Sequence, residues 1–341
     1  MSIDVSVIIS TYNRCHLLPA ALASVLAQEA GCLRYELIVV DNNSTDDTRG
    51  VVESFMARGH ENLRYVFEGQ QGLSYGWNAG IAHSRGEIIA FTDDDLCVAP
   101  DWVSSIKRAF DEHPEVDFIG GKVLPRWETE PPAWLTPDHW APLALADYGE
   151  DSFYSNASYP KCLLGKSFRR EALELAGGFA PEFGRKKDGI GSTEDHELQM
   201  RLWAAGKQGL YVPAVIFVTD VPADRMTKAY HRRWHAGHGK YCAMMRLSEI
   251  IDHDGRLAPE PIASATLLGV PAYIYRELLT ECGRWLRAAL SGPAGLSFLH
   301  ENQARYFMNY IRQTRAQRAA DGGESRLAEM RVFASHLLRK R

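Results

Sequence analysis

The chain has 341 residues, a length that suits one large α/β domain with an appendage better than one small domain. Hydrophobic residues make up 45% and charged residues 24%, which is typical of a globular protein whose core folds without disulfide staples. No run of about 18 apolar residues occurs, which excludes a membrane-spanning helix from the expected elements.

The net charge of −5 is unevenly distributed along the chain. Residues 1–223 carry 32 acidic and 19 basic side chains, whereas residues 224–341 carry 11 and 19, so an acidic body precedes a basic tail region. A basic segment favours anionic lipid or nucleic acid as a partner, although solvated helix faces produce the same charge. Because this region contains no recognisable nucleic-acid-binding module, we do not expect nucleic acid to be a partner.

Six cysteines are widely spaced and form no Cys-x-x-Cys pair, which indicates reduced, cytosolic usage. The N-terminus runs directly into a strand-like segment and shows no signal-peptide pattern. We therefore expect a cytoplasmic protein.

Strand-like and helical segments alternate through the first hundred residues. The expected strands are 5–10, 36–41, 63–67 and 87–92, and the expected helices are about 18–28, one beginning at 44–48, and 73–83. This alternation predicts an α/β fold with a doubly wound, mostly parallel sheet. Ligands of such sheets bind beyond the carboxyl ends of the strands, where Asp41 and Asp93 fall.

The pattern changes after residue 124. Residues 125–160 hold six prolines and three tryptophans without clear periodicity, which predicts a long functional loop. A strand over 162–168 and a helix over 193–205 follow. Residues 210–218 predict a strand at a sheet edge, because Pro213 cannot donate a ladder hydrogen bond. From about residue 225 onward we expect helices.

Asp93, Asp94 and Asp95 directly follow the expected strand 87–92. Adjacent carboxylates repel one another, and a hard divalent cation such as Mg2+ or Mn2+, held with the phosphates of a nucleotide, would offset that repulsion. An exposed acidic turn that caps a helix is the alternative. Asp41 closes the second expected strand, where a carboxylate could bond a base or a ribose hydroxyl, or could simply cap a turn.

A third acidic segment is Thr193-Glu194-Asp195, which follows two glycines and a serine. Glycine permits close approach of a ligand, and Asp195 could act as the general base that activates an acceptor hydroxyl. Capping of a helix by Ser192 or Thr193, with the acids near the positive end of the helix dipole, is compatible with that role.

Five segments in this order resemble the motifs of family 2 glycosyltransferases, which use the nucleotide-sugar-binding fold called GT-A. They are VSVIISTYNR (5–14), ELIVVDNNSTDDT (36–48), GLSYGWNAGIAHSRGEIIAFTDDD (72–95), FRREALELAGGF (168–179) and STEDHEL (192–198). The resemblance implies a GT-A-type sheet with helices on both faces within a catalytic domain. It further implies a nucleotide-sugar half (1–122), an acceptor half (123–223) and a helical C-terminal region (224–341).

The resemblance also implies roles for individual residues. Seven would bind the nucleotide-sugar donor, most often a uridine diphosphate (UDP) sugar: Thr11, Tyr12, Arg14, Asp41, Asn78, Asp93 and Asp94. The first three would line the base pocket, Asp41 would bond the base or ribose, and Asp93 would approach the ribose. Asp95 would bind the Mn2+ or Mg2+ that bridges the diphosphate. Asp195 would be the base of an inverting displacement, with Glu194 positioning the acceptor or supporting its loop.

One position departs from the pattern of the family. The family often has Arg before the Asn of its Gly-rich segment, where this chain has Trp77 followed by Asn78. A cation near the nucleotide is therefore missing or supplied from elsewhere in the chain.

Three histidines, His231, His235 and His238, lie within YHRRWHAGHGK, and helical spacing would place neighbours among them on a shared face. A zinc site is compatible with the spacing, but no Cys or carboxylate completes a ligand set. We expect His235 to complete the metal shell or touch the diphosphate, as a late His does in several enzymes of this fold. Polar residues on a helix beside the active site are the alternative.

Two further segments suggest contact with an acceptor. Trp127, Trp134 and Trp140 of the Pro-rich segment could stack on sugar rings, although packing on the body of the protein is the interpretation we favour. LLGVPAYIYRELL (267–279) mixes aromatic, Leu and Arg residues, and could lie peripherally at the inner face of a membrane or pack between helices. The resemblance implies a glycan or lipid-linked acceptor in polysaccharide or cell-envelope biosynthesis.

Several other motifs are broken or absent. Gly165-Lys166-Ser167 lacks the first glycine of a P-loop, because Pro160 occupies that position. No GxGxxG follows the first strand, and neither HExxH nor GxSxG occurs. Two alternatives remain. A sugar nucleotidyltransferase would begin with a Gly-rich basic loop in place of STYNR, and a degenerate sugar-binding scaffold would not need its intact aspartates.

Overall fold

The computed structural model describes residues 2–185, 190–252, 254–258, 262 and 265–320. The chain forms two compact units, which are described separately. The first unit comprises Met1–Glu128, Leu143–Asp188 and Glu194–Pro222, and the second comprises Thr129–Pro142, Gly189–Thr193 and Ala223–Arg341.

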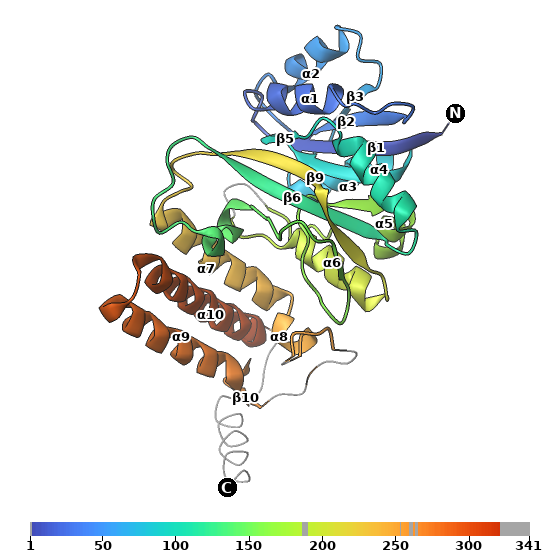
Figure 1. The fold of residues 1–341 in the computed structure, drawn as a ribbon. Coiled ribbons are helices and arrows are strands. Elements are labelled where there is room, and N and C mark those ends of the chain that lie inside the picture. The colour runs from blue at the N-terminus through green and yellow to red at the C-terminus, as the bar shows by residue number, and fades with distance from the viewer. Residues whose placement is uncertain (1, 186–189, 253, 259–261, 263–264, 321–341) are drawn as a thin grey trace. The chain divides into compact units, whose positions relative to one another are not determined.

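A nine-stranded sheet forms the centre of the first unit (Figure 1). Its strands are β1 (Ile3–Thr11), β2 (Tyr35–Asp41), β3 (Leu63–Phe67), β4 (Gly86–Asp93), β5 (Leu96–Val98), β6 (Phe118–Trp127), β7 (Phe153–Ser155), β8 (Ser167–Arg169) and β9 (Gly209–Val221). The order is β3-β2-β1-β4-β8-β6-β9-β5, with β7 also paired to β9. The pairs among β3, β2, β1 and β4 are parallel, as is β6 with β9, which confirms the prediction of a mostly parallel sheet.

The register brings the carboxyl ends of the first strands to one edge of the sheet. Thr11 lies opposite Asp41, and Ser10 lies opposite Asp93. Val7, Ile8 and Ile9 of β1 are fully buried, as expected for a strand covered on both faces. The predicted polar edge beyond these strands is therefore confirmed.

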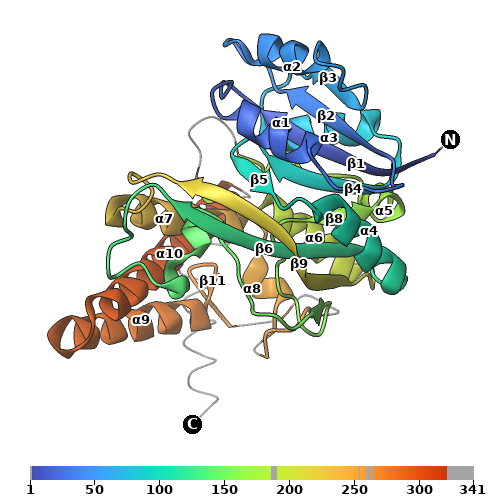
Figure 2. The ribbon, with the colours of Figure 1, turned by 45° about the horizontal axis from the view of Figure 1, so that its top comes forward.

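Among the residues that the structure describes, the first unit has six helices: α1 (Leu18–Leu26), α2 (Thr48–Met56), α3 (Leu73–His83), α4 (Trp102–Glu112), α5 (Arg170–Ala176) and α6 (Glu194–Ala204). Helix α3 packs closely on β1 (Figure 2), because Gly80 lets the helix approach the side chain of Ile8. A Cβ atom at Gly80 would lie 2.4 Å from Ile8 Cγ2, so any larger residue would push the helix away.

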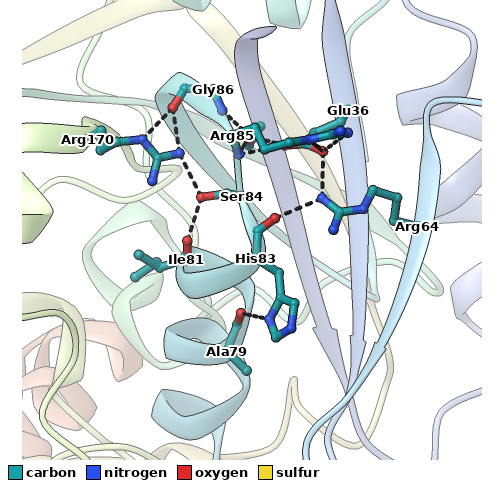
Figure 3. A network of polar contacts seen from close by, with 10 residues as sticks. Glu36, Arg64, Ala79, Ile81, His83, Ser84, Arg85, Gly86 and Arg170 are labelled. Carbon is teal, nitrogen blue, oxygen red and sulfur yellow. Dashed lines mark hydrogen bonds and ion pairs between the residues drawn. The ribbon is translucent and has the colours of Figure 1, made fainter. Parts of the chain in front are cut away.

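The amino end of the sheet is closed by a network around Glu36 (Figure 3). The buried Glu36 carboxylate accepts hydrogen bonds from Ser6 Oγ at 2.8 Å, Arg64 Nη1 at 2.9 Å and Arg85 Nη2 at 2.7 Å. Although burial opposes ionisation, these donors lower the pKa of Glu36 below its ordinary value. Arg170 binds the carbonyl oxygen of Gly86 nearby and ties α5 to the start of β4.

The prediction that 210–218 lies at a sheet edge is wrong. Strand β9 pairs with β6 on one side and with β5 and β7 on the other. Pro213 falls in an irregular stretch of β9, where the partners of β6 shift from Tyr211 to Ile216. A bulge of this kind accepts a proline inside a sheet, because the residues within it have no ladder hydrogen bond to lose.

The predicted strand 162–168 is shorter than expected. Only Ser167–Arg169 forms a strand, and Leu163 instead exchanges two 2.9 Å hydrogen bonds with the side-chain amide of Gln199 on α6. The amide occupies the place of a neighbouring strand, so an apolar run resembles a strand in sequence without being one.

The second unit is mostly helical, as predicted. Its elements are α7 (Lys228–Met244), α8 (Leu247–Ile250), α9 (Ala272–Ser291), α10 (Ala294–Ala320), the hairpin β10 (Thr266–Leu267) with β11 (Val270–Pro271), and the short helices η1 (Pro137–His139) and η2 (Ala141–Leu143), the last of which ends at the border with the first unit. Helix α10 lies alongside α7 and α9 (Figures 1 and 2). Within the described part of the chain, no helix has the length and apolar character needed to cross a bilayer.

Much of the segment 125–160 is packed, and it is not one open loop. Residues up to Trp127 extend β6, and Trp134 packs edge-on against the rings of His139, His231 and Phe298 in the second unit. For Trp134, the structure therefore supports packing on the body of the protein over a free sugar platform.

Candidate functional site

The three consecutive aspartates begin at the last residue of β4 and meet the loop that follows β1. Thr11 Oγ1 donates a 2.7 Å hydrogen bond to Asp94. Arg14 forms ion pairs with both Asp94, at 2.5 Å, and Asp95, at 2.8 Å. Four residues that the sequence assigned to the donor and metal sites are thus brought together, since β1 and β4 are neighbours in the sheet.

This cluster holds more negative charge than its cation offsets. The pKa of Asp93 is raised to about 6, first by burial and then by the nearby carboxylates of Asp95 and Asp195, against the lowering effect of Lys166. Burial raises the pKa of Asp94 to about 7, although Arg14 acts in the opposite direction. Excess acid at the end of a strand is the electrostatic condition under which a bound cation is favoured.

The loops after β1 and β2 are joined by short polar contacts. Asn13 Oδ1 accepts a 2.7 Å hydrogen bond from the backbone of Thr45, and the Asn13 backbone donates to Ser44 Oγ at 3.0 Å. Asn13 and Asn43 both adopt left-handed backbone angles, with φ of 51° and 67°, which asparagine tolerates better than most residues. The segments STYNR (10–14) and DNNS (41–44) therefore form one continuous surface.

Asp41 is buried at the end of β2 and is held from two sides. Its Oδ1 accepts from the Ser44 backbone at 2.8 Å, and its Oδ2 accepts from the Tyr65 hydroxyl of β3 at 2.7 Å. Burial and this carboxylate raise the pKa of Tyr65 to about 12, so its hydroxyl stays protonated and keeps donating. Tyr12 is 38% exposed beside this surface, as a residue that stacks on a base would be.

Asn78 has both ends of its side-chain amide engaged by the chain itself. Its Nδ2 donates to the Phe179 carbonyl at 2.8 Å, and its Oδ1 accepts from the Phe179 backbone at 2.9 Å. These contacts tie α3 to the segment after α5, and they give Asn78 a structural role beside its predicted contact with the donor.

Asp195, the predicted base, pairs with a residue that the sequence interpretation missed. Lys166 Nζ lies 2.5 Å from Asp195 Oδ1, and the lysine side chain is only 8% exposed. Lys166 was considered only as part of a broken P-loop motif. A signal that could have revealed it is a lysine inside an otherwise apolar run, since a buried lysine needs a nearby acid.

Trp77 is buried and lies against both Phe91 and Phe179. The ammonium of Lys166 lies 4.0 Å from the centre of the Trp77 ring. Glu194, next to Asp195, opens α6 and is 6% exposed.

His235 belongs to the second unit, where its Nδ1 lies 3.0 Å from the carbonyl oxygen of His231. Burial lowers the pKa of His235 to about 4, so the ring is neutral near pH 7. His231 packs on Trp134, and His238 stacks on Trp234. Within the described ranges, no three His, Cys, Asp or Glu residues gather to hold a metal by themselves.

The aspartate cluster nevertheless fits a divalent cation. Carboxylate oxygens are the ligands that Mg2+ and Mn2+ prefer. Burial first, and neighbouring carboxylates second, raise the pKa values of Asp93 and Asp94, and a bound cation would offset both effects. Because the described residues do not form a complete ligand set, a cation here would also need the phosphates of a bound nucleotide.

Comparisons with known proteins agree with this geometry. Residues 6–173 match the family model described as Glycosyl transferase family 2. A glucosyl-dolichyl phosphate glucuronosyltransferase of Haloferax volcanii is 28% identical over 189 residues, which cover 54% of this chain and 58% of that relative. The match thus spans less than two thirds of the relative's length.

Solved structures show the same fold. The mannosyltransferase PcManGT of Pyrobaculum calidifontis, in complex with GDP-Man and Mn2+, superposes with a TM-score of 0.57 and 21% identity over 95% of this chain and 89% of its own. S. aureus TarS 1–349 in complex with UDP gives a TM-score of 0.52 and 18% identity over 95% and 93% of the two chains. The predicted GT-A-type architecture is therefore confirmed. With the matched motifs in place, the segment 6–173 belongs to glycosyl transferase family 2.

Proposed function

We propose that the protein is an inverting glycosyltransferase that moves a sugar from a nucleotide diphosphate, most often UDP, to a glycan or lipid-linked acceptor. The donor would lie across the nucleotide-sugar half (1–122) and the acceptor against the half formed by 123–223. The observation that carries the proposal is a set of contacts at the end of β4. Thr11 and Arg14 bind the aspartates there, and Asp93 interacts electrostatically with Asp195.

The donor site follows from the polar edge of the sheet. Asp41 would bond the base or ribose, Tyr12 would stack on the base, and Asp93 would approach the ribose. Arg14 and Thr11 already contact the aspartates, so they would orient the cluster and line the nucleotide pocket. The domain boundary near residue 223 is part of this proposal.

In the reaction, the acceptor oxygen attacks the anomeric carbon as its proton passes to the Asp195 carboxylate. A new carbon–oxygen bond forms at the sugar while the bond from the anomeric carbon to the diphosphate oxygen breaks. The nucleoside diphosphate leaves with the bonding electron pair, and the configuration at the anomeric carbon inverts. Glu194, directly before Asp195 at the start of α6, would position the acceptor.

Asp95, and His235 as a further candidate, would hold a divalent cation. Bound there, Mn2+ or Mg2+ would act as a Lewis acid that stabilises the negative charge of the departing diphosphate. The role of His235 stays a prediction; its ring is neutral near pH 7, and its Nδ1 lies 3.0 Å from the His231 carbonyl oxygen.

The relatives support, but do not identify, the donor and acceptor. The name of the Haloferax relative contains glucosyl-dolichyl phosphate. TarS has been solved with UDP-GlcNAc, and PcManGT with GDP-Man. A role in polysaccharide or cell-envelope biosynthesis agrees with these names.

Calorimetric titration with UDP, GDP, dTDP and CDP, each with and without Mn2+, tests the donor site. We expect one nucleotide to bind, and to bind at least tenfold more tightly with Mn2+. A protein that binds none of the four would contradict the proposal and favour a degenerate scaffold. Nucleotide transfer from a triphosphate to a sugar phosphate would instead support the nucleotidyltransferase alternative.

Asp195→Asn tests the base. We expect transfer to fall by about 10²–10⁴-fold while the affinity for the nucleotide stays unchanged, because the base acts only in the chemical step. Asp111→Asn is the matched control, since Asp111 is an exposed acid paired with Lys107 on α4. Near wild-type transfer by Asp195→Asn would show that the base is a different residue.

We also propose peripheral membrane contact through α9, which gives the predicted contact a specific surface. Leu279, Leu286 and Leu290 are 72%, 63% and 89% exposed, and their spacing places them in one stripe on the helix. Exposed arginines, Arg276 and Arg287, flank that stripe and would complement anionic headgroups.

Vesicle flotation of the whole protein tests this contact. The triple variant Leu279→Gln, Leu286→Gln, Leu290→Gln should lose binding to vesicles of anionic phospholipid, whereas Leu175→Gln, at a similarly exposed leucine of α5, should retain it. Absence of the wild-type protein from the lipid fraction would overturn the membrane proposal without affecting the proposed reaction.

A further inference from the structure

Lys166 is a buried cation of the first unit to which the proposed reaction assigns no role. Its side chain is 8% exposed, and its backbone carbonyl accepts a 3.1 Å hydrogen bond from Phe91 of β4, directly before β8 begins. Burying a lysine is costly unless an opposite charge compensates it. The position is therefore informative only together with the groups that surround the ammonium.

Two groups hold the ammonium from different elements. Asp195 Oδ1 of α6 lies 2.5 Å from Nζ, and the Trp77 ring of α3 has its centre 4.0 Å away, with the Phe179 ring at 5.8 Å. Trp77 is itself fixed by its contacts with Phe91 and Phe179. A cation over the face of an indole ring is attracted by the ring quadrupole, so the ring stabilises Lys166 without neutralising it.

The charges around this pair are mostly acidic. Asp93 interacts electrostatically with Lys166 and Asp195, and also with Asp95 and Arg185. Burial raises the pKa of the Cys162 thiol to about 12. The thiol also interacts electrostatically with Lys166, Lys161, Asp195 and Glu194. Lys166 is the opposite charge that lies directly beside Asp195 in this mostly acidic group, and like charges close together destabilise one another.

We propose that Lys166 is a positioning residue that keeps the Asp195 carboxylate ionised and fixes its orientation. Because the ammonium occupies Oδ1, the second oxygen, Oδ2, is left to take the proton of the acceptor hydroxyl. This inference rests on the proposed role of Asp195, and it names the residue that prepares that base for its step.

The same geometry explains the unusual residue at position 77. An arginine there would place a second positive charge within a few ångströms of Lys166, in the space that a neutral ring now fills. Trp77 and Lys166 therefore form a pair, in which the positive charge comes from the residue directly before β8 and the neutral ring comes from α3.

Lys166→Met tests the proposal, because methionine keeps the length of the side chain and removes its charge. We expect kcat to fall by about 30-fold or more, with the nucleotide affinity within threefold of wild type. The acidic limb of the kcat–pH profile should move upward by one unit or more, because a base without its cation needs higher pH to ionise. Lys166→Arg should recover part of kcat and return the limb toward its original position.

Lys161→Met is the matched control, since Lys161 Nζ lies 4.6 Å over the Tyr148 ring and forms no ion pair with Asp195. It should change neither kcat nor the profile. A fall in kcat for Lys166→Met with an unmoved acidic limb would mean a purely structural role and would overturn the proposal. So would an equal loss of nucleotide affinity, which would assign Lys166 to the donor.

Carboxyl 13C NMR titration of Asp195 separates this inference from the proposed reaction, because it needs no turnover. An upward shift of the Asp195 midpoint in Lys166→Met supports the pairing, and an unchanged midpoint overturns it. If Asp195→Asn leaves transfer intact, the base assignment fails. If Asp195→Asn abolishes transfer while Lys166→Met does not change it, only the present inference fails.

Discussion

The carboxylates at the amino ends and at the carboxyl ends of the parallel strands, here called the amino edge and the carboxyl edge of the sheet, have pKa values shifted in opposite directions. At the amino edge, Glu36 is surrounded by two arginines, a hydroxyl and a backbone N–H, and its pKa is lowered. At the carboxyl edge, burial raises the pKa values of Asp93 and Asp94 to about 6 and 7, and the nearby cations do not reverse this rise. The first arrangement stabilises the fold, and the second stores unfavourable charge that a ligand can relieve.

Both edges use the same parallel strands, so strand geometry does not cause the difference in the pKa values of these carboxylates. The number of cations and hydrogen-bond donors held against each carboxylate causes it. Glu36 binds Arg64 and Arg85 together, whereas Arg14 alone is shared between Asp94 and Asp95. A carboxylate whose pKa is lowered by such a network is therefore more consistent with a structural role than with catalysis.

The largest effect on stability should come from Glu36→Ala. Because removal of the acid leaves buried donors and two arginines without their partner, we expect the free energy of unfolding to fall by about 3–5 kcal/mol. Urea denaturation followed by tryptophan fluorescence would measure it. Glu53→Ala, which breaks an exposed pair with Arg49 on α2, should cost less than about 0.5 kcal/mol. Similar losses in both variants would contradict the contrast between the edges.

Metal with nucleotide should relieve the charge at the carboxyl edge. At a UDP concentration of about 100 times its Kd with Mn2+ present, we expect unfolding to require about 2.7 kcal/mol more. Asp95→Ala should lose most of this gain and should weaken metal-dependent nucleotide binding. Thermal unfolding with and without Mn2+ and UDP measures both, and equal stabilisation of the variant would remove Asp95 from the metal site.

The two edges should also respond to pH with opposite signs in EDTA. Between about pH 4 and 7 the folded protein binds more protons at Asp94 than the unfolded chain does, so its contribution becomes less favourable as pH rises. The lowered pKa of Glu36 gives a stabilisation that is present above the ordinary glutamate pKa and is lost as pH falls through the folded value.

The differences in unfolding free energy between wild type and Asp94→Asn, and between wild type and Glu36→Gln, would isolate these two contributions. We expect them to change in opposite directions with pH. Parallel pH dependence of the two differences would show that both edges are compensated alike.

The smallest effect should come from Tyr65→Phe, which removes one of the two donors to Asp41. We expect a loss of about 1 kcal/mol in nucleotide binding, which corresponds to roughly fivefold in Kd, because the Ser44 backbone still holds the carboxylate. Calorimetry with UDP measures it. Tyr154→Phe, whose hydroxyl binds the exposed Glu115, should leave nucleotide binding unchanged.

Much of the nucleotide half could be predicted because its signals are local. Strands β1, β2, β3 and β4 are short apolar runs that end in polar residues, and helices α1 and α3 carry their own periodicity. Parallel pairing then brings Asp41 and Asp93 to one edge without further information.

Other features depended on contacts between distant segments. The helices α4 and α5 and the strand β5 were not identified from the sequence, and β9 was misplaced at an edge because its bulge is visible only in the register with β6. The apolar run 162–166 imitates a strand, but its hydrogen bonds go to Gln199, which lies 36 residues after Leu163.

The sequence by itself determined the family, the parallel core and the identity of the acidic residues, because these follow from short patterns that one segment carries whole. Only the tertiary structure decided which carboxylates have cations. Arg14 pairs with Asp94, which lies 80 residues away in the sequence. Lys166, directly before β8, pairs with Asp195 of α6. Electrostatic pairing depends on distances of a few ångströms between elements, and no pattern within a single segment records those distances.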